Sequence, residues 1–180
     1  MSIKNLGRIA VLQLLLAVGL APLAHAGNPA TISVTVTIQS LSVSATGPIA
    51  FGTVVAGTQT VSGAGSTVTN DGNVIETFSL SLTNPSTWTA VQAAPSTAED
   101  YALLAEFNSS APAAGSFTYA NHAISTASVA SSATKFAGDQ NGLSIAASGT
   151  RSLWFRFNAP TSTSVTTQQS ITVTVTASAG

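Results

Sequence analysis

Cysteine is absent from all 180 residues of the chain, and its absence removes several kinds of chemistry. Disulfide bonds, thiol nucleophiles and thiolate metal sites are excluded. A lipid-modified N-terminus is also excluded, because that modification needs a cysteine after the cleavage point. A domain of this size must therefore be held together by burial of apolar side chains and by hydrogen bonds of the main chain.

Charged residues are scarce as well. Asp, Glu, Lys and Arg make up 6% of the chain, against about a quarter of an average globular protein. After residue 26 only three cations remain, Lys135, Arg151 and Arg156, against six acidic residues, so the net charge is −3. Nucleic acid and anionic lipid bind clusters of cations, and the sequence has none. Weak charge also leaves little repulsion between copies of the chain, which favours self-association.

The N-terminus has the three-part pattern of a cleaved secretory signal. Two cations precede an apolar run of about a dozen residues (Ile9–Leu20), and Ala24-His25-Ala26 supplies small residues before the cleavage point. The run is too short to span a membrane as a helix. We expect residues 1–26 to be removed and residues 27–180 to form one domain outside the cytoplasm, secreted, at the cell surface or in the periplasm, with no membrane span.

Alternation of apolar and hydroxyl side chains dominates the rest of the chain. Thr31–Ile38 places Ile32, Val34, Val36 and Ile38 on one face, which predicts a half-buried strand. Ser170–Ala177 repeats this pattern near the C-terminus. We expect further strands at residues 49–55, 58–69, 74–83, 87–91, 101–107 and 151–158.

Turn-forming residues separate these runs, as in Asn70-Asp71-Gly72-Asn73 and in Asn84-Pro85. Short strands at this spacing are typical of antiparallel sandwiches and not of alternating strands and helices. We therefore predict an all-β protein, a single immunoglobulin-like antiparallel β-sandwich of about eight to ten strands.

Residues 99–107 fit two structures. Ser96–Glu99 matches a helix capping box, after which Leu103 and Phe107 would share one side of a short helix. As a strand, the segment would turn Leu103 and Phe107 inward and Glu106 outward. We prefer the strand because the rest of the chain has so uniform a β pattern.

Two stretches resemble known families. Ile49-Ala-Phe-Gly-Thr-Val-Val-Ala-Gly57, followed by Val68-Thr-Asn-Asp-Gly-Asn73, resembles PapD-like immunoglobulin-type modules of secreted bacterial proteins, including the choice-of-anchor class. Tyr101–Phe107 and Leu153–Phe157, together with Trp88, are similar to exported β-sandwich proteins that build surface layers, pili or biofilm fibres, among them the camelysin-like fibre proteins. The resemblance implies a structural surface protein and carries over no catalytic residue.

Catalytic motifs are missing from the sequence. His122 is the single histidine after residue 26, and we expect it to be a solvated loop residue. No Gly-x-Ser-x-Gly elbow and no His-Glu-x-x-His motif occurs. Glu99 and Asp100 are sequence neighbours that point to opposite faces of an extended chain, so they do not form the pair that glycoside hydrolysis needs. We expect neither an enzyme nor a cofactor.

Three acidic residues merit separate hypotheses. Glu76 has the parity of core residues, and we expect a strand-mouth position or a bulge to turn it outward, or else an arginine partner. Asp71 and Asp139 lie in oxygen-rich turns that could hold Ca²⁺. The tolerance of Asn and Asp for positive φ explains both turns without a metal, and the two readings stay open.

Trp154 is the side chain that most suggests a ligand. The alternation of residues 151–158 leaves Ser152, Trp154 and Arg156 on the face opposite the core. An exposed aromatic ring beside a guanidinium can bind a sugar or a neighbouring protein. The alternative is that a loop covers this face, or that Arg156 stacks on the ring.

Together these observations predict an exported structural subunit of an extracellular filament, pilus or surface layer. Thr31–Ile38 lies within an exchangeable N-terminal segment, residues 27–44, and could complete the sheet of a neighbouring copy by main-chain hydrogen bonds and pockets for alternate side chains. The expected partner is another copy of the chain. The alternative function is an adhesion module that binds a surface glycan or another surface protein through Trp154.

Overall fold

The computed structural model describes residues 29–180, so the predicted signal at residues 1–26 lies outside the described part. Residues 38–180 form the domain, and residues 29–37, called the arm below, are described separately. The described elements are β1 (Val43–Ala45), β2 (Gln59–Val61), β3 (Ser66–Asn70), β4 (Glu76–Thr83), β5 (Thr89–Ala90), β6 (Asp100–Phe107), η2 (Ala114–Ser116), α2 (Tyr119–His122), β7 (Val129–Ala130), β8 (Thr150–Asn158) and β9 (Thr172–Ala179).

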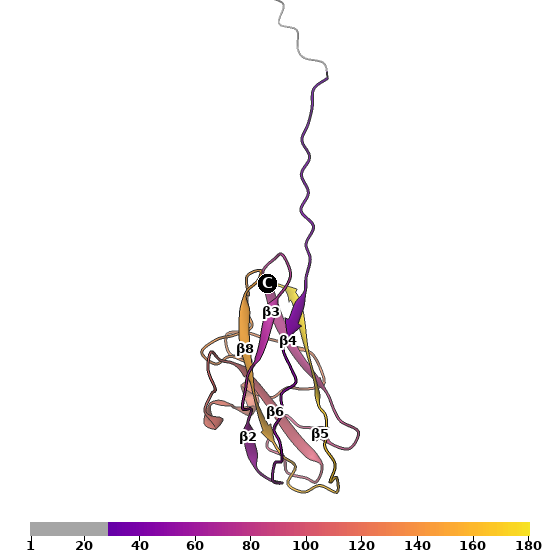
Figure 1. Ribbon diagram of the computed structural model, residues 1–180, viewed down its shortest axis with the longest axis vertical. Coiled ribbons are helices and arrows are strands. Elements are labelled where there is room, and N and C mark those ends of the chain that lie inside the picture. Colours follow the sequence, from indigo (N-terminus) through magenta and orange to yellow (C-terminus); the bar gives the residue numbers. More distant parts are fainter. Residues whose placement is uncertain (1–28) are drawn as a thin grey trace, which may run out of the picture. The chain divides into compact units, whose positions relative to one another are not determined.

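The strands form two sheets, so the prediction of an all-β sandwich is confirmed (Figure 1). The larger sheet has the order β1-β3-β8-β6-β5, with β2 also paired to β8, and the smaller sheet has the order β7-β4-β9. The ladders of both sheets are antiparallel, with the exception of the short ladder between β5 and β6, which is parallel.

One apolar core fills the space between the two sheets. Phe78 and Leu80 of β4 are fully buried, and they meet Leu103 and Phe107 of β6 from the opposite sheet. The rings of Phe78 and Phe107 lie 6.3 Å apart. The alternation in the sequence therefore assigned the inner faces of the long strands correctly.

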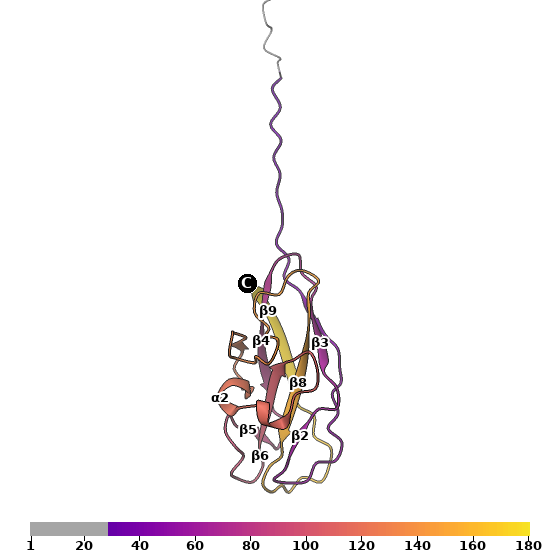
Figure 2. The ribbon, with the colours of Figure 1, turned by 90° about the vertical axis from the view of Figure 1, so that its left-hand side faces the viewer.

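A second layer covers the outer face of the larger sheet. Residues 108–142, called the cap below, include α2, which lies against β6 (Figure 2), and also β7, which pairs with β4 in the smaller sheet. Ala102 and Leu104 of β6 are buried together with Phe117 and Ala123 of the cap. Strand β6 is consequently buried on both faces, which the alternating pattern did not indicate.

The strand expected at residues 99–107 is confirmed as β6, and the helical alternative is wrong. Two other expected strands are absent from the described chain, at 49–55 and at 31–38. Residues 49–55 contribute half-buried side chains to the core but join no ladder. A strand needs a hydrogen-bonded neighbour, and neither segment has one here.

Among residues 29–180, no helix is sufficiently long and apolar to span a membrane.

Candidate functional site: an open groove beside strand β9

Strand β9 has one paired edge and one free edge. It pairs with β4 over its whole length of eight residues, from Thr172 opposite Thr83 to Ala179 opposite Glu76. No strand of the described chain pairs with its other side. A free edge presents unpaired N–H and C=O groups, to which another extended segment can add.

A groove of about 930 Å³ runs beside this edge. Core side chains of the larger sheet form its floor, half-buried side chains at β9 form one wall, and residues 45–56 form the other wall. None of the lining residues is charged. The large apolar residues that line it are Ile49, Phe51, Val54, Trp88, Leu103, Leu153, Phe155, Phe157, Val165, Ile171, Val173 and Val175.

The groove is an opening into the main core and not a separate pocket. Leu103, Phe155 and Phe157 belong to the core cluster, and Val173 and Val175 are half-buried residues packed against it. In a closed sandwich such side chains would be covered by a neighbouring strand. Here one strand position beside β9 is empty, so the lining is suited to an apolar segment in extended form.

The chain ahead of β1 is fixed by the loop between β3 and β4. Residues 38–42, called the root below, are hydrogen-bonded to this loop and to Glu76, the first residue of β4. The amide of Asn73 donates to the carbonyl oxygen of Ile38 at 2.8 Å, and its Oδ1 accepts from the N–H of Ser40 at 2.8 Å. The N–H of Ser42 donates to Oε1 of Glu76 at 2.8 Å. The position of Ile38 is therefore determined by the domain.

Next to the root, the chain carries a row of exposed apolar side chains. Ile32, Val34 and Val36 of the arm and Ile38 of the root are between 78% and 89% exposed. Thr31–Ile38 is as long as β9 and has the same alternation. Isolated exposed aliphatic residues are ordinary, but four at alternate positions of one segment indicate a face that is buried in another state.

Glu76 begins β4 and is fully buried, so the expected outward turn is wrong. Its Oε1 accepts from Ser42, whereas Oε2 has no hydrogen-bond partner, and neither arginine pairs with it among the described contacts. The alternation of β4, which places Glu76 on the same face as the core residues, therefore predicted its position correctly. Burial is possible because the root passes over the carboxylate and supplies a main-chain donor. The carboxylate holds the root in place.

The Ser152–Trp154–Arg156 face is covered by the cap. Arg156 is buried, and its guanidinium donates to the carbonyl oxygens of Ala114 at 2.6 Å and Phe117 at 2.9 Å. Burial lowers the pKa of this guanidinium. The expectation of an exposed aromatic–guanidinium pair is therefore wrong for Arg156, and the alternative of a covering loop is correct.

Trp154 is half-buried, and its Nε1 donates to the carbonyl oxygen of Asn108 at 2.9 Å. Ser152 is half-buried in the same strand, and its N–H faces Gln140 of the cap at 3.4 Å. Binding of a glycan or a protein by Trp154 stays a prediction, without an observation in its favour.

His122 is buried, so its expected place in a solvated loop is wrong. Its Nδ1 accepts from the N–H of Thr118 at 2.8 Å, and Nε2 lies 3.1 Å from the carbonyl oxygen of Ala137. Glu106 lies on the outer face of β6, as expected, but it is buried there 4.0 Å from Nε2 and accepts from Ser116. Since main-chain groups occupy both ring nitrogens, this cluster lacks the serine–histidine contact of a catalytic triad.

The two candidate calcium turns are occupied by hydrogen bonds or open to solvent. Both carboxylate oxygens of Asp139 accept from Ser109, one from the N–H and one from the hydroxyl group. Asp71 is exposed, and its N–H donates to Ser42. Within residues 29–180, no group of three acidic or histidine side chains is placed to hold a metal ion.

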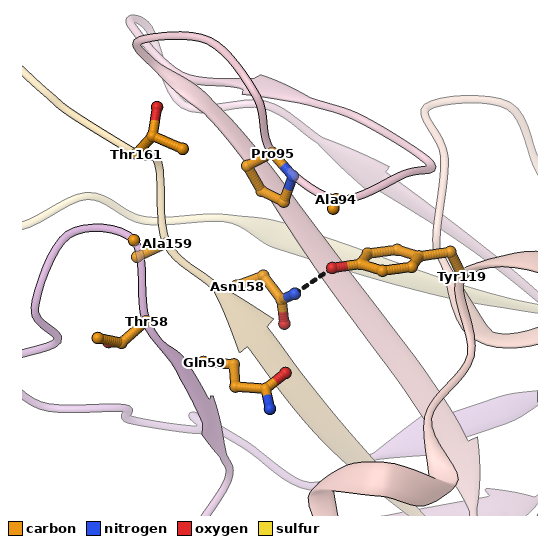
Figure 3. Close-up of a pocket in the computed structure, with 9 residues that line it drawn as sticks. Thr58, Gln59, Ala94, Pro95, Tyr119, Asn158, Ala159 and Thr161 are labelled. Carbon is orange, nitrogen blue, oxygen red and sulfur yellow. Dashed lines mark hydrogen bonds between the residues drawn. The ribbon is translucent and has the colours of Figure 1, made fainter.

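A smaller hollow of about 180 Å³ lies on the outer side of the larger sheet (Figure 3). Tyr119 of the cap and Asn158 of β8 form its base, and the amide of Asn158 donates to the phenol oxygen. Gln59 and Pro95 lie at its rim. Its few polar groups are partly paired with each other, and the hollow has about the size of a few water molecules.

The sequence pattern identified the alternating residues of β9 and of Thr31–Ile38 but did not identify the groove. Its wall includes Ile49, Phe51 and Val54, which were expected to belong to a strand. The similarity of the two end segments could have indicated the groove. Both have the sequence pattern of a half-buried strand, and β9 lies at this side of the core.

Comparison of the chain with protein-family models, curated proteins and solved structures finds no match.

Proposed function

We propose that this protein is an exported structural subunit that assembles into an extracellular filament, pilus or surface layer by strand donation. Thr31–Ile38 of one copy lies in the groove beside β9 of the next copy and adds a strand to its smaller sheet. Ile32, Val34, Val36 and Ile38 are the donated apolar side chains. Export itself is supported by the signal pattern of residues 1–26.

The observation that carries the proposal is the correspondence between the groove and the exposed segment. The groove lies beside the unpaired edge of β9, reaches along that strand as far as Val175, and is lined by core side chains. The segment has eight residues, alternates in the same way and exposes four apolar side chains. Each feature lacks a partner within the described chain, and each supplies what the other needs.

The energies involved favour assembly over exposure. Burying one aliphatic side chain of this size stabilises by about 1.5–3 kcal/mol, so four such residues drive association strongly. Main-chain hydrogen bonds to β9 fix the strand at the edge, because a buried N–H or C=O without a partner costs about 1–3 kcal/mol. Alternate side chains then enter the groove, and hydroxyl side chains remain on the outer face.

A pair of matched variants in the mature protein tests the proposal. Val34→Asp places a carboxylate on the donated apolar face, where burial of an unpaired charge is strongly unfavourable. Thr35→Asp places the same charge one residue away, on the face that stays in solvent. We expect Val34→Asp to abolish assembly and Thr35→Asp to retain it, as measured by light scattering and negative-stain electron microscopy.

The unfolding midpoint of the purified subunit serves as the folding control. Residue 34 lies in the arm and is exposed, so Val34→Asp should leave the domain's midpoint unchanged in the unassembled state. Equal assembly of both variants would refute strand donation. A lower unfolding midpoint for the Val34→Asp monomer than for the wild-type monomer would also refute it, because the arm would then fill the groove of its own domain.

A further inference from the structure

The two ends of the groove differ. At the end called the root end, Ala179 of β9 lies opposite Glu76, and the N–H of Gly180 donates to the carbonyl oxygen of Ile75. At the other end, called the far end, Thr172 lies opposite Thr83. Strand β9 thus runs from the far end to the root end.

The root end is already occupied by the domain itself. Strand β1 contacts β9, and Val43 packs against the core there. The groove lining ends at Val175 of β9 and at Ala45 of the opposite wall. A strand that entered from this end would have to displace β1, which is paired with β3, or the root, which is hydrogen-bonded to Asn73 and Glu76.

The far end has no such obstruction by a strand. Its lining residues come from segments 51–56 and 163–170, which belong to no ladder in the described chain. Val55 of the first segment is 70% exposed. At the root end, Leu41 and Ile75 are 45% and 52% exposed. Each end of the domain therefore presents apolar side chains that the other end could cover.

We infer that the donated segment enters at the far end and runs antiparallel to β9, so that subunits join head to tail without a flexible linker. This inference rests on the proposed strand donation. Since Ile38 is fixed by Asn73 in its own subunit, it stays at the mouth of the neighbour's groove. The arm then extends toward the neighbour's root end. In this register Val36 lies opposite Ile171, Val34 opposite Val173 and Ile32 opposite Val175.

The polarity of the strand determines the kind of assembly. An antiparallel strand joins the root end of one copy to the far end of the next, which is a heterologous contact that repeats and leaves open ends. A parallel strand would join two root ends, and two copies could then exchange arms and close as a symmetric dimer. Antiparallel pairing is also the commoner and slightly more stable arrangement.

Cysteine cross-linking of the full mature chain tests the polarity, and the wild-type chain has no cysteine to interfere. One variant carries Thr31→Cys with Thr176→Cys, which antiparallel pairing brings close together. The other carries Thr31→Cys with Ser170→Cys, which parallel pairing brings close together. In the wrong polarity the two residues are separated by about six residues of strand, or about 20 Å, well beyond the reach of a disulfide.

We expect oxidation of the 31/176 variant to give a reducible ladder of covalent multimers, and the 31/170 variant to give none beyond the Thr31→Cys single variant. A ladder from the 31/170 variant, covalent dimers alone, or an intrachain disulfide would each overturn the inference. Loss of assembly in Val34→Asp without cross-links in either variant would overturn this polarity but keep strand donation. Assembly that withstands Val34→Asp would overturn both.

Discussion

At the scale of single residues, position 72 has room for glycine alone. A Cβ there would lie 2.3 Å from Oε1 of Glu76 and 2.5 Å from the carbonyl oxygen of Ser40. Gly72→Ala therefore pushes the root away from the β3–β4 loop, and we expect a loss of about 1–3 kcal/mol in the free energy of unfolding, as for other overpacked sites. Urea denaturation measures the loss.

Gly63→Ala is the matched control, because a Cβ at position 63 meets nothing within 4 Å. Its stability should stay the same or rise slightly, since alanine restricts the unfolded chain. Equal losses in the two variants would contradict the contact at Gly72 as the cause.

Glu99 links the start of β6 to the far end of the groove. Its Oε1 accepts from the N–H of Ser164 and its Oε2 from the hydroxyl of Thr163, each at 2.6 Å. These hydrogen bonds hold the pKa of Glu99 below its ordinary value of 4.5, and the bond from the Ser164 N–H has the largest effect. Their stabilising contribution is therefore present above pH 4.5 and is lost as the pH falls through the lowered pKa.

We expect acid to loosen the loop around Ser164. The amide resonance of Ser164 should titrate with a midpoint below 4.5 in an NMR series, and Glu99→Gln should remove this titration. A midpoint at or above the ordinary value would contradict the assignment of these hydrogen bonds to the ionised carboxylate.

At the scale of elements, Arg156 fastens the cap to β8. Its guanidinium bonds to two cap carbonyl oxygens and, through Nε, to Asn158 at 3.1 Å. A lysine ammonium cannot reproduce this planar fork, so Arg156→Lys should lower the free energy of unfolding by about 1.5–3 kcal/mol. Arg151→Lys, in the same strand, also loses a hydrogen bond from Nε to the carbonyl oxygen of Asn141 at 3.1 Å. Because this side chain is half-exposed and water can replace the bond, its cost should be smaller, at most about 0.5–1 kcal/mol. Similar urea midpoints for the two variants would contradict this role.

The cap also marks the limit of what alternation can predict. Alternation located β4, β6, β8 and β9 and their inner faces, because a half-buried strand must alternate. It placed Glu106 and Arg156 in solvent because the outer face of a sheet is polar by default. Residues 108–142 carry little periodicity, so nothing in the local pattern indicated that part of this segment packs on that face and buries both side chains.

At the scale of the whole molecule, the scarcity of charge leads to a prediction about assembly conditions. The groove lining and Thr31–Ile38 contain no charged residue. Assembly should therefore change little between about 50 mM and 1 M NaCl, because neither of the two paired surfaces carries a charge that salt could screen. It should weaken on cooling, as apolar burial does. Sedimentation across these conditions measures both, and dissociation by salt would contradict an apolar junction.

The groove itself could not be predicted from the sequence, for a reason that belongs to the whole fold. The C-terminal segment was correctly predicted as a strand, whereas Thr31–Ile38 was expected to be a half-buried strand and instead joins no ladder and is exposed. A pattern reports what a segment can bury, but not whether its own domain has a place for it. Here the place beside β9 is empty and Ile32, Val34 and Val36 are exposed.

The contacts of the root bear on how the protein would carry a mechanical load. Main-chain and side-chain bonds join residues 38–46 to residues 66–76 along their length, from Ile38 with Asn73 to Thr46 with Thr67. Tension applied through Ile38 along this ribbon would act across all of these bonds in shear, so they would have to rupture together and not one after another. The root would then resist stretching better than its few hydrogen bonds suggest.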